Sequence, residues 1–364
     1  MRAAILEAFN EPLVIRDVTL AEPGPHEVVV RTAAVGLCHS DLHFMTGDRK
    51  IPLPGVLGHE VAGVIEQIGP DVPGLKVGDH VVGTLTAYCG HCPSCVVGNQ
   101  VNCSDTDVRH LPGTTNRLSD SRGKVSQVYN LSGFAEKMLV HYSCLVPITK
   151  DMPLDRAALL GCATLTGTGA VFRSAKVEPG STVAVIGCGG IGLSTINGAK
   201  IAGAGRIIAI DLSDKKLDMA MQFGATDRIN ATSTDPVEAV RELTRGGVAF
   251  SFECIGLPAA ATQAFAMLAA NGTATILGVF PVGAEITLPT DGLLQQKRLQ
   301  GSFLGSARLP VDIPRLVDHY LAGRLYLDEM VSQRITLDQI NDGFDDMKKG
   351  NVARSVIVFP GVGV

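Results

Sequence analysis

The chain has 364 residues, of which 46% are hydrophobic and 18% charged, so it has enough apolar material for a core and too little charge for a disordered chain. Its 31 Lys and Arg residues against 36 Asp and Glu residues give a formal charge of −5, which argues against nucleic acid or an anionic membrane as a partner. The length predicts two domains, and 41 Gly residues without any Trp favour an α/β protein with tight strand-to-helix turns over an all-β sandwich.

The first 150 residues predict a small, irregular β domain. Short extended runs at 27–31, 61–65 and 80–83 are separated by Gly, Pro and Asp. The amino-terminal segment meets an acid at Glu7 before any long apolar run forms, which argues against a secretory signal. No later window approaches the ~20 uninterrupted apolar residues of a membrane span. We therefore expect a soluble, cytoplasmic protein that does not bind membranes.

A short string near the end of this domain's first long strand gathers a thiol, two imidazoles, a hydroxyl and a carboxylate. These groups belong to Cys38, His39, Ser40, Asp41 and His43. His59 and Glu60 follow about twenty residues later, and Cys162 stands much further along the chain. Two Cys and one His as ligands, with the fourth position left open, are typical of a catalytic zinc. Spacing alone supports this interpretation only weakly, because an isolated Cys or His is more often a packed or solvated residue.

Four more cysteines fall within fifteen residues in the spacing C-x2-C-x2-C-x7-C. They are Cys89, Cys92, Cys95 and Cys103. Four thiolates can surround one tetrahedral Zn²⁺, and turn formers such as Gly90 and Pro93 let so short a loop close around it. The alternatives are buried or disulfide-bonded cysteines, which the compartment disfavours, and an iron–sulfur cluster, which usually has a shorter last gap followed by Pro. A nucleic-acid zinc knuckle is disfavoured because no Lys or Arg lies between 84 and 103. We predict a structural zinc, since a closed four-sulfur site leaves no position for a substrate.

The pattern of predicted elements changes after about residue 155. The polar stretch 104–127 before it is expected to be a long surface loop. Beyond it, strand-like runs at 182–186, 206–210, 248–253, 273–279 and 300–304 alternate with helical patterns, which predicts a parallel sheet with crossover helices. The chain ends with a further strand-like run at 355–359.

The run at 182–186 leads into a glycine-rich turn of the form G-x-G-x-x-G. The turn consists of Gly187, Cys188, Gly189, Gly190, Ile191 and Gly192. Such glycines let the backbone approach a pyrophosphate at a helix N-terminus, although the motif alone is often only a turn. Here Asp211 stands 24 residues after the first glycine, at the end of the next strand-like run. Its carboxylate would bind the adenosine ribose hydroxyls and repel a 2′-phosphate, and no Arg follows directly, so we predict NAD rather than NADP.

Several of these motifs resemble the zinc-dependent alcohol dehydrogenases of the medium-chain dehydrogenase/reductase family. The string Gly58-His59-Glu60-x2-Gly63-x5-Gly69-x2-Val72 is similar to that family's zinc-binding motif. The Gly-x-Cys-His-Ser-Asp string, the four-cysteine segment and the glycine-rich turn recur in the same order and spacing. The resemblance covers essentially the whole chain.

The resemblance implies roles for residues around a catalytic zinc. Cys38, His59 and Cys162 would hold the ion, with Glu60 behind it as a transient ligand or nearby charge. Asp41 would orient His59 by accepting its other ring N–H, and Ser40 and His43 would pass the alcohol proton toward solvent. Each has an ordinary alternative: a capping carboxylate for Asp41, an ion-pair partner for Glu60, a turn serine for Ser40 and a surface imidazole for His43.

The resemblance also implies cofactor and substrate contacts. Residues matching positions that contact the cofactor, in addition to the turn and Asp211, are His39, Thr166, Lys216, Val279 and Arg354. Among these, His39 and Arg354 would meet the pyrophosphate, while Lys216 would lie near the adenosine ribose unless it is only a surface lysine. The substrate pocket would include Leu85, Val279 and Phe303. Leu85 stands where relatives often carry an aromatic pocket wall, which leaves room for primary aromatic or medium-chain alcohols.

The expected architecture is a GroES-like irregular β catalytic domain (1–157, with the structural zinc segment 89–103 and the returning 304–364) around a doubly wound Rossmann domain (158–303). The expected enzyme oxidises an alcohol to an aldehyde or ketone with NAD and two zinc ions per chain, as a homo-oligomeric dimer or tetramer. The strand near 300–304 resembles the family's subunit seam. Rival functions are a glutathione-adduct formaldehyde dehydrogenase or aldehyde reductase on the same scaffold, and a non-catalytic zinc- and NAD-binding protein. The last is disfavoured because Cys38, Ser40, His43, His59 and Cys162 occur together.

Overall fold

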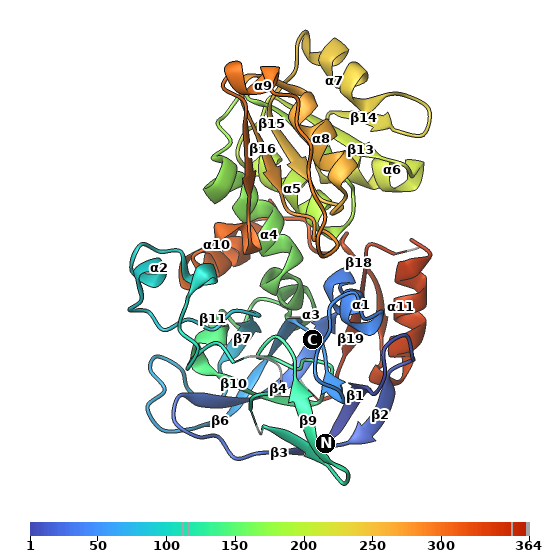
Figure 1. The fold of residues 1–364 in the computed structure, drawn as a ribbon. Coiled ribbons are helices and arrows are strands. Elements are labelled where there is room, and N and C mark those ends of the chain that lie inside the picture. Colours follow the sequence, from blue (N-terminus) through green and yellow to red (C-terminus); the bar gives the residue numbers. More distant parts are fainter. Residues whose placement is uncertain (111–112, 116, 351, 362–364) are drawn as a thin grey trace. The chain divides into compact units, whose positions relative to one another are not determined.

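The structure is a computed structural model that describes residues 1–110, 113–115, 117–350 and 352–361. It divides the chain into two compact units (Figure 1). Unit 1 comprises Met1–Cys162, Arg308–Ala322 and Leu327–Val364, and unit 2 comprises Ala163–Ala307 and Gly323–Tyr326. Among the helices of these described residues, none combines the length and apolar character that a membrane crossing needs.

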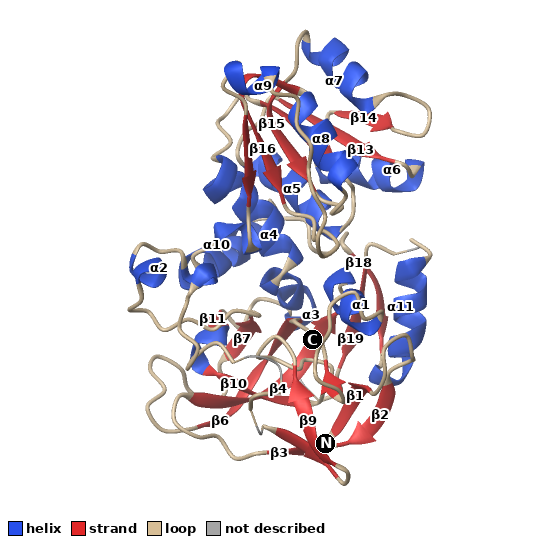
Figure 2. Ribbon diagram, in the orientation of Figure 1, coloured by secondary structure: helices blue, strands red, loops and turns tan. Residues whose placement is uncertain are grey.

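Unit 1 is built from two sheets, drawn in red in Figure 2. The first sheet has the order β2-β1-β5-β9-β8-β3, formed by β1 (Arg2–Leu6), β2 (Val14–Asp17), β3 (Thr19–Leu20), β5 (Gly55–Val56), β8 (Leu118–Asp120) and β9 (Gly123–Gln127). The second has the order β11-β7-β6-β4-β19-β18, with β10 also paired to β4. Its strands are β4 (Glu27–Gly36), β6 (Glu60–Ile68), β7 (His80–Gly83), β10 (Lys137–His141), β11 (Leu145–Ile148), β18 (Val331–Ile335) and β19 (Arg354–Val358).

Strand β4 is the central element of unit 1. It pairs antiparallel with β6, β10 and β19, so the carboxy-terminal part of the chain completes a sheet begun by the amino-terminal part. Its sequence EVVVRTAAVG is buried at eight of ten positions, which explains why its apolar run is nearly continuous instead of alternating. This two-part construction of the irregular β domain confirms the predicted fold class.

Short helices connect the strands of unit 1 and carry several of the predicted site residues. They are α1 (His39–Met45), α2 (Pro93–Val96), η1 (Gln100–Asn102), η2 (Tyr142–Cys144), α3 (Leu154–Ala157), η3 (Ala158–Gly161), α10 (Leu309–Leu321), η6 (Leu337–Gln339) and α11 (Ile340–Lys348). Within the stretch 104–127, the structure contains the hairpin β8–β9, so the prediction of one long loop there was wrong. Residues 111, 112 and 116 of this stretch lie outside the described residues.

Unit 2 contains a six-stranded sheet in the order β14-β13-β12-β15-β16-β17, and all five pairings are parallel. The strands are β12 (Thr182–Ile186), β13 (Arg206–Asp211), β14 (Asp227–Asn230), β15 (Val248–Glu253), β16 (Leu268–Ile276) and β17 (Arg298–Gly301). The helices are α4 (Ala163–Gly169), the π-helical η4 (Ala170–Ala175), α5 (Gly190–Ile201), α6 (Asp214–Phe223), α7 (Pro236–Thr244), α8 (Pro258–Ala266), α9 (Asp291–Leu294) and η5 (Leu304–Ser306). This strand order is that of the doubly wound dinucleotide-binding fold and confirms the predicted Rossmann sheet.

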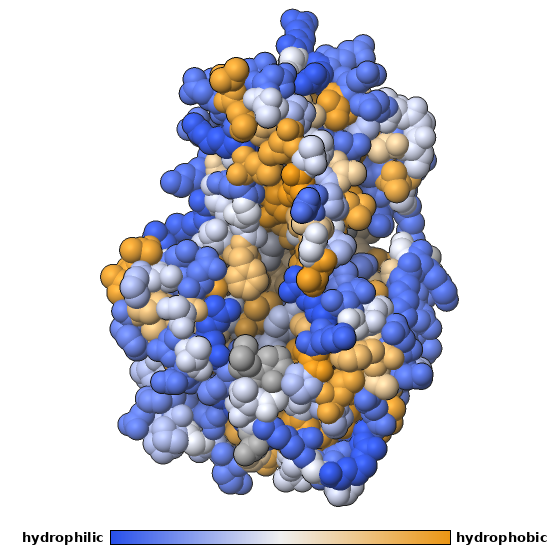
Figure 3. Space-filling model, viewed as in Figure 1, coloured by the Kyte–Doolittle hydropathy of each residue, from blue (hydrophilic) through white to orange (hydrophobic). Residues whose placement is uncertain are grey.

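The core of unit 2 forms where helices pack on this sheet. Buried side chains of β12 and β13, such as Ile186 and Ile208, join Phe265 of α8 in one apolar cluster. Both sheet neighbours of β12 are parallel strands, so its residues are shielded on all sides and read as an apolar run. The face seen in Figure 3 is mostly hydrophilic, with hydrophobic residues visible over both units.

Candidate active site and metal centres

The four-cysteine segment folds into a small lobe of unit 1. Pro93 opens the one-turn helix α2, which carries Cys95, while Cys103 directly follows η1. The Sγ atoms lie 4.0 Å apart for Cys89 and Cys95, 3.9 Å for Cys92 and Cys103, and 3.7 Å for Cys103 and Cys89. Zn–S bonds of 2.3 Å in a tetrahedron place sulfurs about 3.8 Å apart, whereas disulfide sulfurs are about 2.05 Å apart. The geometry of the lobe therefore fits a tetrahedral zinc.

Backbone groups of the lobe support sulfur in its charged form. The Cys92 N–H donates to Cys89 Sγ at 3.3 Å, and the Cys89 N–H donates to Cys103 Sγ at 3.4 Å. Hydrogen bonds from the backbone of Ser104 and Cys95 lower the pKa of Cys92 to about 6, whereas burial raises the pKa of Cys89 and raises that of Cys95 to about 12. A thiolate is the form that binds a metal, so these donors also suit a zinc site.

The second group of candidate ligands lies where three segments of unit 1 meet. Cys38 precedes α1, His59 directly precedes β6, Glu60 is the first residue of β6, and Cys162 follows η3. Their ligand atoms all lie within 4.8 Å of one another, and the four side chains are buried. The structure thus brings together Cys38, His59, Glu60 and Cys162, which are up to 124 residues apart in the sequence.

The ring of His59 has one nitrogen with a partner and one without. His59 Nδ1 lies 3.0 Å from Asp41 Oδ1, which also accepts the Gly58 N–H at 3.0 Å, so the predicted contact between Asp41 and His59 is present. Because the carboxylate accepts a proton from Nδ1, the neutral ring has its lone pair on Nε2. That atom is buried and has no hydrogen-bond partner in the described structure. A lone pair buried beside two thiols fits a metal ligand.

The charges around this group favour a cation. Although burial opposes a charge on His59, the Asp41 carboxylate and the Cys38 sulfur raise its pKa well above the usual value. A hydrogen bond from Cys162, together with His59 and Arg354, lowers the pKa of Cys38. Positive charge is therefore stabilised at the point that a metal ion would take.

Glu60 and Arg354 form a buried ion pair behind these ligands. Arg354 Nε donates to Glu60 Oε2 and Nη2 to Oε1, each at 3.1 Å, and Arg354 Nη2 lies 3.9 Å from Cys38 Sγ. Burial raises the pKa of Glu60 to about 7, although Arg354 opposes this shift. The guanidinium of Arg354, expected from the sequence at a pyrophosphate, is 3% exposed and bound to Glu60 within unit 1.

Helix α1 carries the residues expected to move a proton. His39 is exposed at its start, Ser40 is half-buried, and His43 Nδ1 lies 3.1 Å from Asp48 Oδ2. Asp48 is held in turn by the Thr46 hydroxyl at 2.9 Å. Sequence reasoning did not select Asp48; the available signal was an acid five residues after His43, just beyond the helix end.

Tyr129 is a second residue that the sequence analysis missed. Its ring centroid lies 4.8 Å from that of His59 and 5.0 Å from that of Phe44, and it stands in the left-handed region with φ +55°. Burial raises the pKa of Tyr129 above its usual value, so the phenol is neutral. No sequence pattern pointed to it, because the bend that follows β9 brings it to the metal-ligand group. Leu85 is also buried, two residues after the end of β7.

Unit 2 holds the predicted cofactor residues other than His39 and Arg354, which belong to unit 1. Gly187 has φ +93°, Gly189 precedes α5, and a Cβ on Gly192 would lie 1.8 Å from the Gly187 carbonyl, so the turn requires glycine there. Asp211 Oδ2 accepts the Cys188 N–H at 2.8 Å, which joins the acid to the turn. The remaining predicted residues are placed as follows: Gly190 and Ile191 in the first turn of α5, Lys216 half-buried in α6, Thr166 buried in α4, and Val279 and Phe303 36% and 46% exposed.

A parallel six-stranded sheet with a glycine-rich turn, an irregular β unit with a four-sulfur lobe, and a buried Cys/His/Cys group together define a zinc-type dehydrogenase. Comparison with known proteins agrees. The family model described as "Alcohol dehydrogenase GroES-like domain" matches residues 24–150, and that described as "Zinc-binding dehydrogenase" matches residues 190–321.

Individual relatives match nearly the whole chain. "Alcohol dehydrogenase-like 5" from Arabidopsis thaliana is 37% identical over 371 residues, covering 98% of this chain and 95% of the relative. An alcohol dehydrogenase zinc-binding domain protein from Burkholderia ambifaria has TM-score 0.95 at 36% identity, covering 99% of this chain and 98% of its own. Benzyl alcohol dehydrogenase from Acinetobacter calcoaceticus has TM-score 0.92 at 35% identity, covering 98% and 99%. A zinc-binding dehydrogenase from Sinorhizobium meliloti 1021, bound to NADP, has TM-score 0.83 at 29% identity, covering 98% and 99%.

The chain belongs to the zinc-dependent alcohol dehydrogenases of the medium-chain dehydrogenase/reductase family, as its sequence motifs predicted. It is an oxidoreductase that uses zinc and a nicotinamide cofactor.

Proposed function

We propose that this enzyme oxidises primary aromatic or medium-chain alcohols with NAD and carries one catalytic and one structural zinc per chain. The observation that carries this proposal is the unpartnered, buried Nε2 of His59 beside the sulfurs of Cys38 and Cys162. Three such ligands leave one coordination position for an alcohol, whereas the lobe closes with four sulfurs.

The ligands and their neighbours have separate roles in this reaction. Cys38, His59 and Cys162 would hold the zinc, which would supply a Lewis acid toward the alcohol oxygen, while a bound nicotinamide would supply the hydride acceptor. Asp41 keeps the proton of His59 on Nδ1, so that Nε2 remains a ligand. The Ser40 hydroxyl accepts the alcohol proton, and His43 passes it to solvent.

Preference for NAD rests on Asp211. Its carboxylate, held at the glycine-rich turn, provides acceptors for the two ribose hydroxyls and repels the extra negative charge of a 2′-phosphate. The residues that follow it are Leu212 and Ser213 instead of an arginine. The alternative is a preference for NADP, which is the cofactor bound in the relative from Sinorhizobium meliloti 1021.

The proposed substrate class rests on the side chains around the metal-ligand group. Leu85 is smaller than an aromatic residue, and Tyr129 offers a ring edge and face beside His59 on which an aromatic alcohol can pack. The similarity to a benzyl alcohol dehydrogenase supports the same class.

Initial rates of NADH formation across a panel of alcohols test the proposal. We expect kcat/KM with NAD to exceed that with NADP by about two orders of magnitude, and benzyl alcohol to exceed ethanol by about tenfold or more. Asp211→Ser should reduce the preference for NAD, whereas Asp214→Asn, a change at an exposed acid three residues on, should not. Equal or better rates with NADP, the highest kcat/KM with ethanol, or strict dependence on glutathione would each contradict the proposal.

A further inference from the structure

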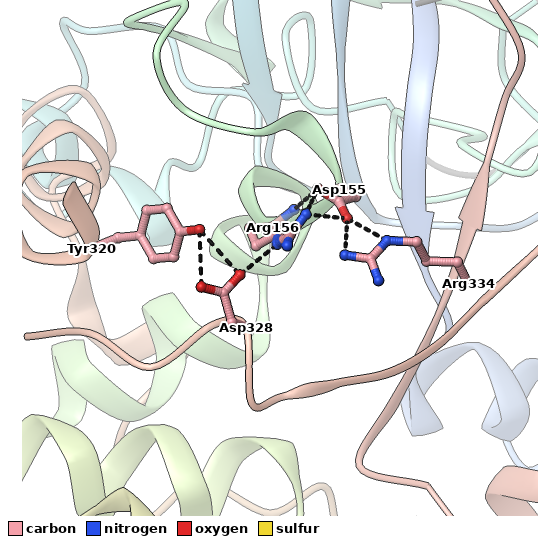
Figure 4. Close-up of polar contacts among 5 residues, drawn as sticks. All are labelled: Asp155, Arg156, Tyr320, Asp328 and Arg334. Atoms are coloured by element: carbon pink, nitrogen blue, oxygen red, sulfur yellow. Dashed lines mark hydrogen bonds and ion pairs between the residues drawn. The ribbon is translucent and has the colours of Figure 1, made fainter. Parts of the chain in front are cut away.

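An ionic network around one buried carboxylate lies at the beginning of the segment that ends at Cys162 (Figure 4). The Asp155 carboxylate is fully buried and accepts two hydrogen bonds from Arg156 Nη1, at 2.8 and 2.7 Å. Arg334 of β18 contacts the same carboxylate through Nε at 2.8 Å and Nη2 at 2.7 Å. The Arg156 backbone N–H adds a further bond at 3.0 Å. Five donor contacts thus hold one carboxylate in a single orientation.

The network extends outward to a second carboxylate. Arg156 Nε donates to Asp328 Oδ1 at 2.6 Å, and the Tyr320 hydroxyl of α10 donates to the two oxygens of Asp328 at 3.1 and 3.3 Å. Two guanidinium groups and two carboxylates balance in charge. All five residues belong to unit 1 and come from three separate parts of its chain.

The segment that Asp155 anchors leads directly to a proposed zinc ligand. Helices α3 and η3 run without a break from Leu154 to Gly161, and Cys162 follows. They pack on β4, which ends two residues before Cys38, and on β6, which begins directly after His59. Six residues therefore connect the anchor to the ligand, and five of them are buried.

The carboxy-terminal end of the segment 154–162 has little room to move. A Cβ on Gly161 would lie 2.3 Å from the Gly83 carbonyl oxygen, so the backbone there is in close contact with β7. A rotation or shift of α3 would have to be taken up at Cys162, because η3 has no room to absorb it.

A buried ion pair seldom adds net stability over apolar residues of the same size, so its value lies in the geometry that it enforces. We infer that Asp155, held by Arg156 and Arg334, is a positioning residue that sets the place of Cys162 and thereby the retention of the catalytic zinc. The inference rests on the proposed catalytic site, since it requires zinc at Cys38, His59 and Cys162.

The rate of zinc release to a chromophoric chelator tests this inference on the intact, zinc-loaded protein. The two network variants are Asp155→Asn and Arg334→Met. Arg334→Met removes only the half-exposed guanidinium that contacts Asp155, so this variant should fold even if Asp155→Asn does not. Arg117→Met is the control, because Arg117 is an arginine of unit 1 whose ion pair, with Glu27, lies outside the segment 154–162. Cys162→Ser identifies which release phase belongs to the catalytic site.

We expect either network variant to release one zinc about tenfold faster or more, with the second zinc of the lobe unchanged. Arg117→Met should lower the melting temperature without this selective change. Unchanged release from a folded network variant, or equal acceleration of both zinc ions, would overturn the inference while leaving the proposed function intact. If Cys162→Ser holds as much zinc as the wild type, the proposed catalytic site itself is wrong and the inference falls with it.

Discussion

The ring of His43 has a partner on the side where a proton relay needs one. Asp48 Oδ2 faces its Nδ1 at 3.1 Å, and a carboxylate in this place keeps the ring proton on Nδ1 and the lone pair on Nε2, ready to accept a proton. We predict that Asp48→Asn lowers kcat about tenfold at neutral pH, with KM for the alcohol and zinc content unchanged. Steady-state kinetics and metal analysis measure both.

A double-mutant comparison decides whether Asp48 acts through His43. The variant with both Asp48→Asn and His43→Gln should be no slower than His43→Gln alone, since the carboxylate then has no ring to orient. Lys50→Gln, an equally exposed change two residues on, is the control. If the two substitutions reduce kcat by the product of their separate factors, Asp48 influences the rate independently of His43.

Single residues also mark the limit of what sequence reasoning finds. Cys38, His59 and Cys162 were selected because thiols and imidazoles carry chemistry in any context and because the family spacing matched. Tyr129 and Asp48 were not selected, because a tyrosine or an aspartate becomes part of a site only through its position. For Tyr129, that position depends on a left-handed backbone bend after β9 that no local pattern announces.

At the scale of elements, the junction of β10 and η2 contains a buried histidine that must stay neutral. His141 Nδ1 accepts the Ser143 N–H at 3.2 Å, and burial, aided by Arg117, His26 and His110 against the opposing Glu27, lowers the pKa of His141 to about 4. Because the unfolded chain binds this proton more readily, the stability that His141 provides is complete above about pH 6.5 and is lost as the pH falls toward 4.

Urea unfolding at two pH values tests this prediction. Between pH 7.5 and 5.5 the free energy of unfolding should fall by about 1 kcal/mol more in the wild type than in His141→Asn, whose amide oxygen can still accept from Ser143. His43→Asn, a change at an exposed imidazole, should keep the wild-type loss. An equal loss in His141→Asn would show that other groups cause the acid sensitivity.

The cysteine lobe and the catalytic ligands should respond differently to the loss of one thiol. The lobe has a four-residue helix and two valines, Val96 and Val97, that are each 71% exposed, so little apolar core holds it without its metal. Cys95→Ala should therefore lower soluble yield and melting temperature, with kcat per folded molecule retained. Cys38→Ala changes a residue among pre-formed strands and should keep the fold while kcat falls by several orders of magnitude.

Melting curves, zinc content and kcat for the two variants check this contrast. Each should lose about one zinc per chain from an expected two. A Cys95→Ala protein as stable as wild type but inactive, or a Cys38→Ala protein with normal turnover, would mean that the two sites have been assigned the wrong roles.

Strands were predictable from the sequence where both faces of the sheet are covered. Strands β12 and β15 match the expected runs 182–186 and 248–253, because strands in the middle of a parallel sheet are mostly buried and mostly apolar. Strand β14, at the edge of the same sheet, was not expected, since Asp227, Arg228 and Asn230 make it polar. The hairpin β8–β9 was missed for a similar reason: its short strands are held by pairing with β3 and β5, which the local composition does not reveal.

On the scale of the whole molecule, the order of the motifs along the sequence carried most of the information about the fold. The return of the carboxy-terminal strands to the amino-terminal domain follows from family resemblance and is visible in the pairing of β19 with β4. The Asp155 network was not foreseeable, because Asp155 and Arg334 are 179 residues apart and only the folded chain places them together.

The two units differ in what they bind, and this difference gives the last prediction. Both sets of candidate zinc ligands belong to unit 1, whereas the glycine-rich turn and Asp211 belong to unit 2. Amide hydrogen exchange reports local opening, and a ligand protects the state that binds it. Removing zinc with a chelator should therefore speed exchange in peptides covering 89–103 and 154–162 and leave β12, β13 and β15 unchanged. Adding NAD to the zinc-loaded protein should instead slow exchange at residues 187–192, and NADP at the same concentration should do so less. Chelation that speeds exchange equally in the strands of unit 2, or NAD that gives no protection at the turn, would contradict this separation of metal and cofactor binding.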